Sequence, residues 1–182
     1  MTPKSGTHTI GPQEGSLTVH TFRAGMGAKI GHDLVLEAKK WNGTVNIDAD
    51  NPAASSVEVT VDLNSLEIVN ATGGVKPLSD KDRADIAKNI EKTLDTGKHP
   101  NVTFKSTSVT GSAPTVSVTG DLTIKGTTRP ATLDVTADGN RVTGKASVVQ
   151  TEFGIKPFSA MMGALKVRDD INLEFTCTLP SA

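Results

Sequence analysis

The sequence predicts a mainly β protein: a single antiparallel, eight-stranded β-barrel with one amphipathic α-helix. Composition is one reason, because Val, Ile, Thr and Ser abound while aromatic residues make up only 3%, and β-branched side chains suit pleated sheets. The second reason is that apolar and polar residues alternate along most of the chain, as in strands with one buried face. The length of 182 residues suits one domain, 1–182, in which 1–5 form a flexible tail.

About eight segments show this alternation, and short polar stretches connect them. In 55–63, apolar residues occupy every second position and polar residues fill the places between. The Asp-Gly-Asn sequence at 138–140 is a strong signal for a hairpin turn. The eight segments are 16–24, 41–47, 55–63, 102–105, 116–124, 133–137, 142–148 and 170–179.

One segment, 79–95, has helical rather than strand periodicity. Ser79 is placed as its N-cap, and Asp82 stands at the capping-box position. Apolar residues then recur at every fourth position, which gives one apolar stripe and an otherwise polar surface. These residues are Ile86, Ile90 and Leu94. A second, short helix or turn is predicted near 158–165, where nearly all residues are apolar or small.

About eight meandering strands can close as a barrel or split into a two-sheet sandwich. We favour the barrel, because closure removes the exposed edges of long Val- and Thr-rich strands. Several inward positions are small, at Gly120, Ala137, Gly144 and Ala146. We therefore expect a partly vacant interior, although glycine also marks bends at barrel corners. The alternative is a barrel packed with its own side chains that acts as a protein-interaction module.

Charge and composition argue against several partners. The formal net charge is -1, with one Trp and no Tyr, so the chain lacks the positive field and the stacking surfaces that nucleic acid requires. No apolar stretch approaches the ~20 residues that span a bilayer, and residues 1–6 lack the apolar core of a signal peptide. We expect a cytoplasmic protein with at most transient membrane contact, or an exported one if a leader has been removed.

We predict no catalytic residues, no metal and no cofactor. The four His residues do not pair at metal-ligand spacing, and Cys177, the only cysteine, lies in an alternating apolar run that predicts a buried thiol. The Arg-Asp-Asp cluster at 168–170 predicts a solvated strand entry or a local ion pair. The protein is therefore predicted not to be an enzyme. Catalysis on a hydrophobic substrate would require buried titratable groups that this sequence does not supply.

Several motifs occur in a characteristic order along the chain. They are Gly31-His32-Asp33-Leu34, Trp41-Asn42-Gly43, Asp62-Leu63-Asn64-Ser65-Leu66, His99-Pro100-Asn101-Val102-Thr103-Phe104, the stretch 120–129, Phe153-Gly154-Ile155 and Val167-Arg168-Asp169-Asp170. With these motifs, the chain resembles the YceI-like family of lipocalin-shaped, polyisoprenoid-binding proteins from about Gly6 to Leu179. The resemblance implies an extended barrel whose tubular pocket takes a long isoprenoid or fatty chain. It also implies a binding or transport role without catalytic residues, and it is compatible with a homodimer.

We therefore predict a hydrophobic small-molecule ligand in the barrel interior: a polyisoprenoid, an isoprenoid quinone or a fatty-acid-like lipid. Residues 153–165 offer six large apolar side chains, among them Met161 and Met162, which adapt to irregular shapes. This segment is predicted to be either a lid that gates ligand entry or a plug in one barrel end. The predicted ligand-binding residues are Val59, Val61, Phe104, Val118, Leu122, Leu133, Val135, Val148, Phe153, Ile155, Phe158, Met161, Met162, Leu165, Leu173 and Phe175.

Overall fold

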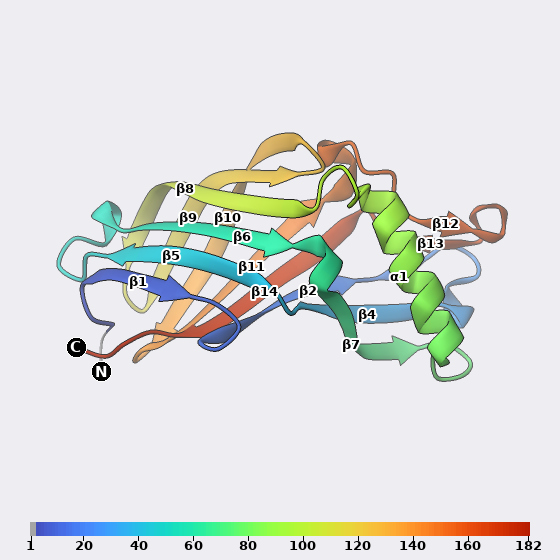
Figure 1. Ribbon diagram of the computed structural model, residues 1–182, viewed down its shortest axis with the longest axis horizontal. Coiled ribbons are helices and arrows are strands. Elements are labelled where there is room, and N and C mark those ends of the chain that lie inside the picture. Colours follow the sequence, from blue (N-terminus) through green and yellow to red (C-terminus); the bar gives the residue numbers. More distant parts are fainter. Residues whose placement is uncertain (1–2) are drawn as a thin grey trace.

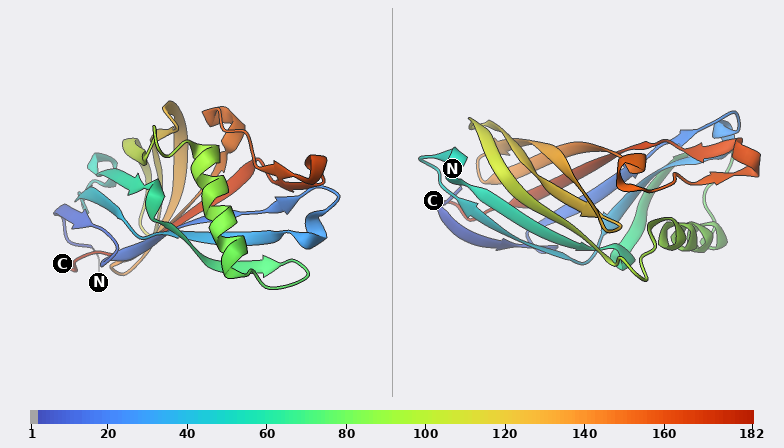
Figure 2. Two further views of the ribbon diagram at one scale, coloured as in Figure 1. Left: turned by 45° about the vertical axis from the view of Figure 1, so that its right-hand side comes forward. Right: turned by 90° about the horizontal axis from the view of Figure 1, so that it is seen from above.

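The computed structural model describes residues 3–182, and eleven of its strands pair into one antiparallel sheet (Figure 1). This main sheet curls into a half-barrel, whose curvature Figure 2 shows from two sides. Its strands, in the order in which they pair, are β1 (Gly6–Ile10), β5 (Trp41–Ile47), β6 (Ser56–Asp62), β8 (Asn101–Ser112), β9 (Thr115–Ile124), β10 (Thr127–Asp138), β11 (Arg141–Val149), β14 (Asp170–Thr178), β2 (Gly15–Thr21), β4 (His32–Ala38) and β7 (Leu66–Gly73).

The mainly β fold with one helix is confirmed, but the predicted eight-stranded barrel is wrong. Each of the eight predicted segments contributes a strand to the main sheet, although the end of 16–24 forms β3 (Arg23–Ala24) outside it; the main sheet also contains β1, β4 and β7. These three strands lack clean alternation: β1 is apolar only at Ile10, and β4 contains the unbroken apolar run 34–36. In β7, a bulge at Val69 shifts the register with β4 between Val35 and Leu36. An inserted residue reverses the facing of every residue after it, and this hides the strand pattern.

The chain turns from β4 into β5 at Lys39 and Lys40, and Ser65 holds this bend. The Lys39 N–H donates to the Ser65 carbonyl oxygen at 3.1 Å, and the Lys40 N–H donates to Ser65 Oγ at 2.9 Å. The Ser65 hydroxyl donates to the Asp62 carbonyl oxygen at 2.7 Å. Ser65 belongs to η3 (Leu63–Ser65), the short turn between β6 and β7. One buried hydroxyl thus connects two bends and satisfies backbone groups in both.

Replacing this hydroxyl should destabilise the fold. In Ser65→Ala, the Lys40 N–H loses its acceptor, and we expect the free energy of unfolding to fall by about 1–2 kcal/mol. Urea unfolding followed by circular dichroism measures this change. Ser108→Ala, at an exposed position in β8, is the matched control and should stay within about 0.5 kcal/mol of the parent protein. Equal effects of the two substitutions would contradict this role of Ser65.

The predicted helix is confirmed as α1 (Asp80–Leu94), which lies across one end of the half-barrel (Figure 1). Its capping box is formed as expected: the Asp82 N–H donates to Ser79 Oγ at 3.1 Å, and the Ser79 N–H donates to the Asp82 carboxylate at 2.9 Å. Asp95 ends the helix in the left-handed conformation. Because these signals are local, the sequence alone predicted the helix and both of its ends.

The segment near 158–165 forms a β-hairpin, and the predicted short helix or turn is confirmed only as the turn at its tip. Strands β12 (Ser159–Ala160) and β13 (Leu165–Val167) flank the turn η5 (Met161–Gly163). β13 also pairs with β3 (Arg23–Ala24), and the three strands form a second small sheet. Residues 161–163 all have positive φ values, which an α-helix does not accept. The hairpin therefore extends away from the main sheet.

Candidate ligand-binding cavity

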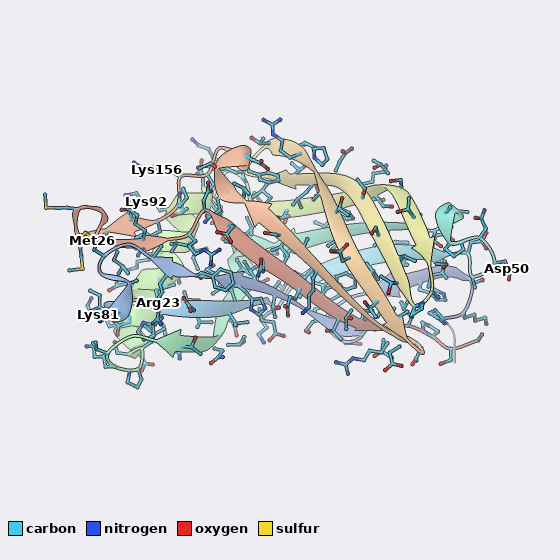
Figure 3. The ribbon with its side chains drawn as sticks, turned by 180° about the vertical axis from the view of Figure 1, so that it is seen from behind. Arg23, Met26, Asp50, Lys81, Lys92 and Lys156 are labelled. Carbon is cyan, nitrogen blue, oxygen red and sulfur yellow. The ribbon has the colours of Figure 1, made fainter. Side chains whose placement is uncertain are left out.

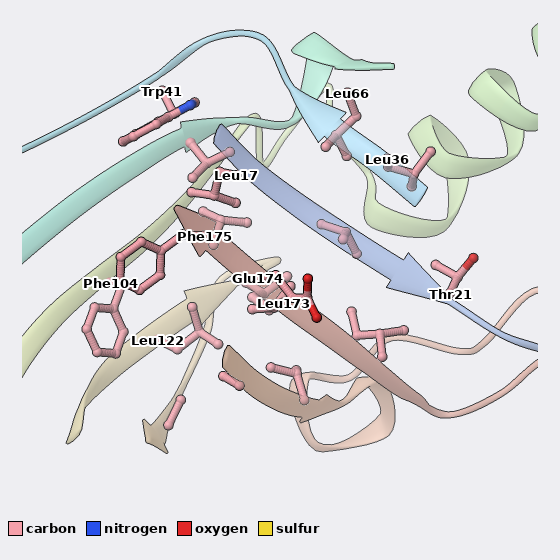
Figure 4. A pocket seen from close by; sticks show the side chains of 18 of the residues that line it. Leu17, Thr21, Leu36, Trp41, Leu66, Phe104, Leu122, Leu173, Glu174 and Phe175 are labelled. Atoms are coloured by element: carbon pink, nitrogen blue, oxygen red, sulfur yellow. The ribbon is translucent and has the colours of Figure 1, made fainter. Parts of the chain in front are cut away.

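The concave side of the main sheet encloses a cavity with a volume of about 990 Å³. Side chains from strands that are far apart in sequence point into this shared space (Figure 4). Those labelled in the figure include Leu17 of β2, Leu36 of β4, Phe104 of β8, Leu122 of β9 and Phe175 of β14. The apolar stripe of α1 covers part of the cavity, with Ile86, Ile90 and Leu94 in its wall. An interior of this size is not the packed centre that the alternative interpretation required.

Thirteen of the sixteen predicted ligand-binding residues line this cavity. They are Val59, Val61, Phe104, Val118, Leu122, Leu133, Val135, Val148, Ile155, Phe158, Leu165, Leu173 and Phe175. Ten of these come from strands whose alternation gave their facing directly. The structure therefore brings them together as the pattern indicated, whereas their contact with a ligand stays a prediction.

The other three predicted residues do not line the cavity. Phe153 is only 3% exposed, but it packs in the wall as part of a hydrophobic core cluster. Met161 and Met162 are 62% and 107% exposed at the tip of the hairpin. Placing these two in the barrel interior was wrong, because the turn at 161–163 points their side chains away from the sheet. In this structure they neither fill an end of the cavity nor cover it.

Sequence reasoning missed part of the wall. Leu34 and Leu36 of β4, together with Leu66 of β7, line the cavity, but their strands lack a clean alternation. The sequence predicts the apolar stripe of α1. The periodicity of a helix does not indicate which surface such a stripe packs against. Trp41 also lines the cavity, and its indole N–H has no hydrogen-bond partner among the described residues. A buried N–H of this kind favours a ligand or water molecule that carries an acceptor.

Two inward glycines do not create the vacant space, contrary to expectation. A Cβ atom on Gly120 would lie 2.6 Å from Cζ of Phe104, and one on Gly144 would lie 1.9 Å from Cε1 of Phe175. Each glycine instead gives room to an aromatic ring from a neighbouring strand. The cavity is left by the curvature of the sheet, since aliphatic side chains on a wide arc do not reach its centre.

One end of the cavity, here called the mouth, carries basic side chains. Arg23, His32 and Lys76 line the cavity there, and the His32 ring nitrogen Nε2 lies 2.9 Å from the Lys76 carbonyl oxygen. Gly73 and Gly74 make room for them: a Cβ atom would lie 1.4 Å from Nη1 of Arg23 on the first and 2.4 Å from the His32 ring on the second. The mouth thus combines an apolar interior with polar and charged groups at its edge, where Asp82 and Asp85 of α1 also line the cavity.

The titratable groups away from the mouth make local contacts. Within residues 3–182, no three His, Cys, Asp or Glu side chains gather closely enough to hold a metal ion. The predicted local ion pair is confirmed, with Arg168 Nε 2.9 Å from the Asp170 carboxylate. Asp169 instead accepts hydrogen bonds from Thr151 at 2.9 and 2.6 Å. These interactions join the start of β14 to the turn after β11.

The Cys177 thiol is buried, as predicted, with 2% exposure. Burial, and secondarily the nearby Glu14 charge, raise the pKa of this thiol to about 11 from the ordinary 9.0. We expect iodoacetamide to alkylate it slowly in the native protein at about pH 8 and rapidly after unfolding. Mass spectrometry of the alkylated protein measures both rates.

The same shift has a pH signature. Between pH 9.0 and about 11 the unfolded chain loses the thiol proton while the folded protein keeps it. The unfolded state then binds fewer protons, so the free energy of unfolding falls as pH rises through this window. Cys177→Ala should show a smaller decrease over the same window in chemical denaturation. Identical pH profiles for the two proteins would contradict this assignment.

A family model for the YceI-like domain matches residues 9–179 of this chain. The chain belongs to the YceI-like family. Protein YceI of Escherichia coli is 38% identical over 96 residues, which cover 53% of this chain and 44% of that protein. A UPF0312 protein of Pseudomonas paraeruginosa is 30% identical over 128 residues, covering 64% of this chain and 60% of the relative. The matches thus span about half the length of these curated relatives.

Two solved structures share the fold. The chain is similar to BcnA of Burkholderia cenocepacia with a TM-score of 0.66 and 18% identity, over 91% of this chain and 96% of BcnA. It is also similar to the YCEI protein of Campylobacter jejuni, with a TM-score of 0.54 and 14% identity, over 84% and 86% of the two chains. In residues 3–182, no helix is long and apolar enough to cross a membrane.

Proposed function

We propose that this YceI-like protein binds and carries a long apolar ligand in its cavity without catalysing a reaction on it. The ligand class is a polyisoprenoid, an isoprenoid quinone or a fatty-acid-like lipid. The observation that carries the proposal is the volume of about 990 Å³ with a wall of mostly aliphatic side chains. This volume lies at the upper end of the roughly 300–1,000 Å³ of small-molecule pockets.

The volume also indicates the size of the ligand. An engineered apolar cavity of about 150 Å³ accepts benzene, with its six carbon atoms. On that scale, 990 Å³ has room for roughly 40 carbon atoms, which suits a long chain better than a compact molecule.

An empty interior is energetically unfavourable. Without a ligand, the apolar wall of this cavity is left in contact with water, which is unfavourable in proportion to its area. Water can form few hydrogen bonds with these walls. An apolar ligand is therefore a more favourable occupant of the cavity than water.

Exchange with a membrane explains how such a ligand is both held and released. Moving a tail of about 40 carbons from water would gain roughly 0.8 kcal/mol per carbon, which exceeds the about 18–21 kcal/mol that non-covalent complexes reach. In a bilayer the tail is already dehydrated, so its transfer into the cavity is nearly neutral. Arg23, His32 and Lys76 at the mouth favour a polar end that carries negative charge or acceptor oxygens.

The test is the content of the purified protein. We expect native mass spectrometry, on protein prepared without detergent, to show a bound species that organic extraction identifies as a lipid. Protein stripped of this species should take up a dispersed polyprenol or cis-parinaric acid with one ligand per chain. Protein that is consistently empty and takes up neither probe would contradict the proposal.

A further inference from the structure

Three fully or largely exposed methionines gather at one tip of the molecule. Met26 is 99% exposed, Met161 62% and Met162 107%. The loop that holds Met26 contacts the hairpin that holds the other two, since the Gly27 N–H donates to the Ala164 carbonyl oxygen at 2.7 Å. Figure 3 shows Met26 at the extreme end of the molecule, opposite Asp50. We call these three side chains the methionine tip.

The methionine tip adjoins the mouth of the cavity. Ala160 and Leu165, which flank the turn of Met161 and Met162, line the cavity, and so does Ile30 at the end of the Met26 loop. Ile30 is itself 42% exposed. Apolar surface therefore continues from the tip into the interior.

The segments around the mouth are basic, although the whole chain is nearly neutral. Residues 22–32, 72–79 and 153–168 contain no Asp or Glu. Their cationic residues are Arg23, Lys29, Lys76, Lys156, Lys166 and Arg168. Arg23 and Arg168 pair with acidic residues, while the four lysines have no acidic partner in the part of the chain that the structure describes. Acidic residues border these segments at Asp33, Asp80, Glu152 and Asp169, and Asp33 is the partner of Arg23.

The backbone of the tip is strained without gaining any burial. Met161 and Met162 have φ values of 52° and 56°, a left-handed conformation that costs free energy for residues with a Cβ atom. Such strain is unusual unless the conformation serves an interaction. In this turn, the left-handed conformation exposes two flexible apolar side chains to solvent.

We propose that the methionine tip docks on an anionic bilayer surface and sets the mouth of the cavity against it. This inference rests on the proposed function, because it names the place where the ligand is loaded and released. The methionines would insert at the boundary between headgroups and acyl chains, while the four lysines meet the anionic headgroups. A small inserted apolar area together with basic charge gives reversible binding of the protein to the bilayer. Reversible binding suits a protein that repeatedly loads and releases its ligand.

Vesicle binding tests the docking. We expect sedimentation with vesicles of equal parts phosphatidylcholine and phosphatidylglycerol, much weaker sedimentation with phosphatidylcholine alone, and weakening as salt screens the charges. The triple variant Met26→Ser, Met161→Ser and Met162→Ser should lower the partition coefficient at least about tenfold. Val69→Ser, at an exposed apolar position of β7, is the matched control and should leave it unchanged.

An environment-sensitive dye locates the contact. Attached to Met162→Cys, the dye should shift its emission to the blue on anionic vesicles and be quenched by lipids with brominated chains. Attached to Asp50→Cys, at the opposite end (Figure 3), it should show neither effect. Cys177 is 2% exposed and escapes labelling in the native protein.

The outcomes separate docking from ligand binding. Uptake of a dispersed polyprenol by the triple-serine variant should equal that of the parent protein, while transfer of polyprenol from anionic vesicles should slow at least about tenfold. Failure of both proteins to take up polyprenol would overturn the proposed function. The docking would be overturned if the parent protein did not bind vesicles or if the triple variant bound them equally well. The exposed methionines would then be assigned to contact with a protein partner.

Discussion

Leu173→Trp is expected to lower the affinity for a polyprenol or cis-parinaric acid at least about tenfold. Leu173 lies in the middle of β14, between Ala146 of β11 and Val19 of β2, and it lines the cavity (Figure 4). The larger indole would extend into the space that the ligand needs. Excluding only two methylene groups from the cavity already costs about 1.6 kcal/mol, which exceeds a factor of ten in affinity.

Fluorescence titration measures this loss, and a neighbouring substitution separates blockage from damage to the fold. Asn172→Trp places the same side chain on the outer face of β14 and should leave the affinity unchanged. Because the new indole occupies vacant space, Leu173→Trp should keep its free energy of unfolding within about 1 kcal/mol of the parent protein. If both variants bound equally well, the cavity would not be the ligand site.

Gly15→Ala is expected to be the most destabilising single substitution that we propose. Gly15 opens β2 and pairs with Cys177 of β14. A Cβ atom on it would lie 1.9 Å from the Thr176 carbonyl oxygen and 2.9 Å from Cα of Cys177. Backbone atoms cannot rotate away as a side chain does, so the two strands must separate. We expect the free energy of unfolding to fall by about 3 kcal/mol.

Gly97→Ala is the matched control for this substitution. A Cβ atom on Gly97 would meet no atom within 4 Å, so the free energy of unfolding should change by less than about 0.5 kcal/mol. Chemical denaturation of both variants measures the contrast. Equal stability of the two would mean that β2 and β14 do not approach as closely at Gly15 as described.

The sequence by itself determined the local elements. Alternation in segments such as 55–63 and 170–179 gave both the strand and the side that faces inward, because the facing of side chains in a strand repeats every two residues. Ser79 and Asp82 gave the start of α1, because caps act on neighbouring backbone groups. Most of the predicted cavity wall follows from these two kinds of local pattern.

Only the tertiary structure decided which strands complete the cavity wall and which apolar residues lie outside the cavity. All three residues of 34–36 are apolar, so the pattern does not show which of them face inward, and the pairing of β4 with β2 and β7 decides it. Likewise, Met161 and Met162 have the same apolar character as the wall residues, yet they lie outside the cavity. Hydrophobicity favours burial without saying against which surface. That choice depends on pairings between distant strands, such as β13 with β3, which no local pattern encodes.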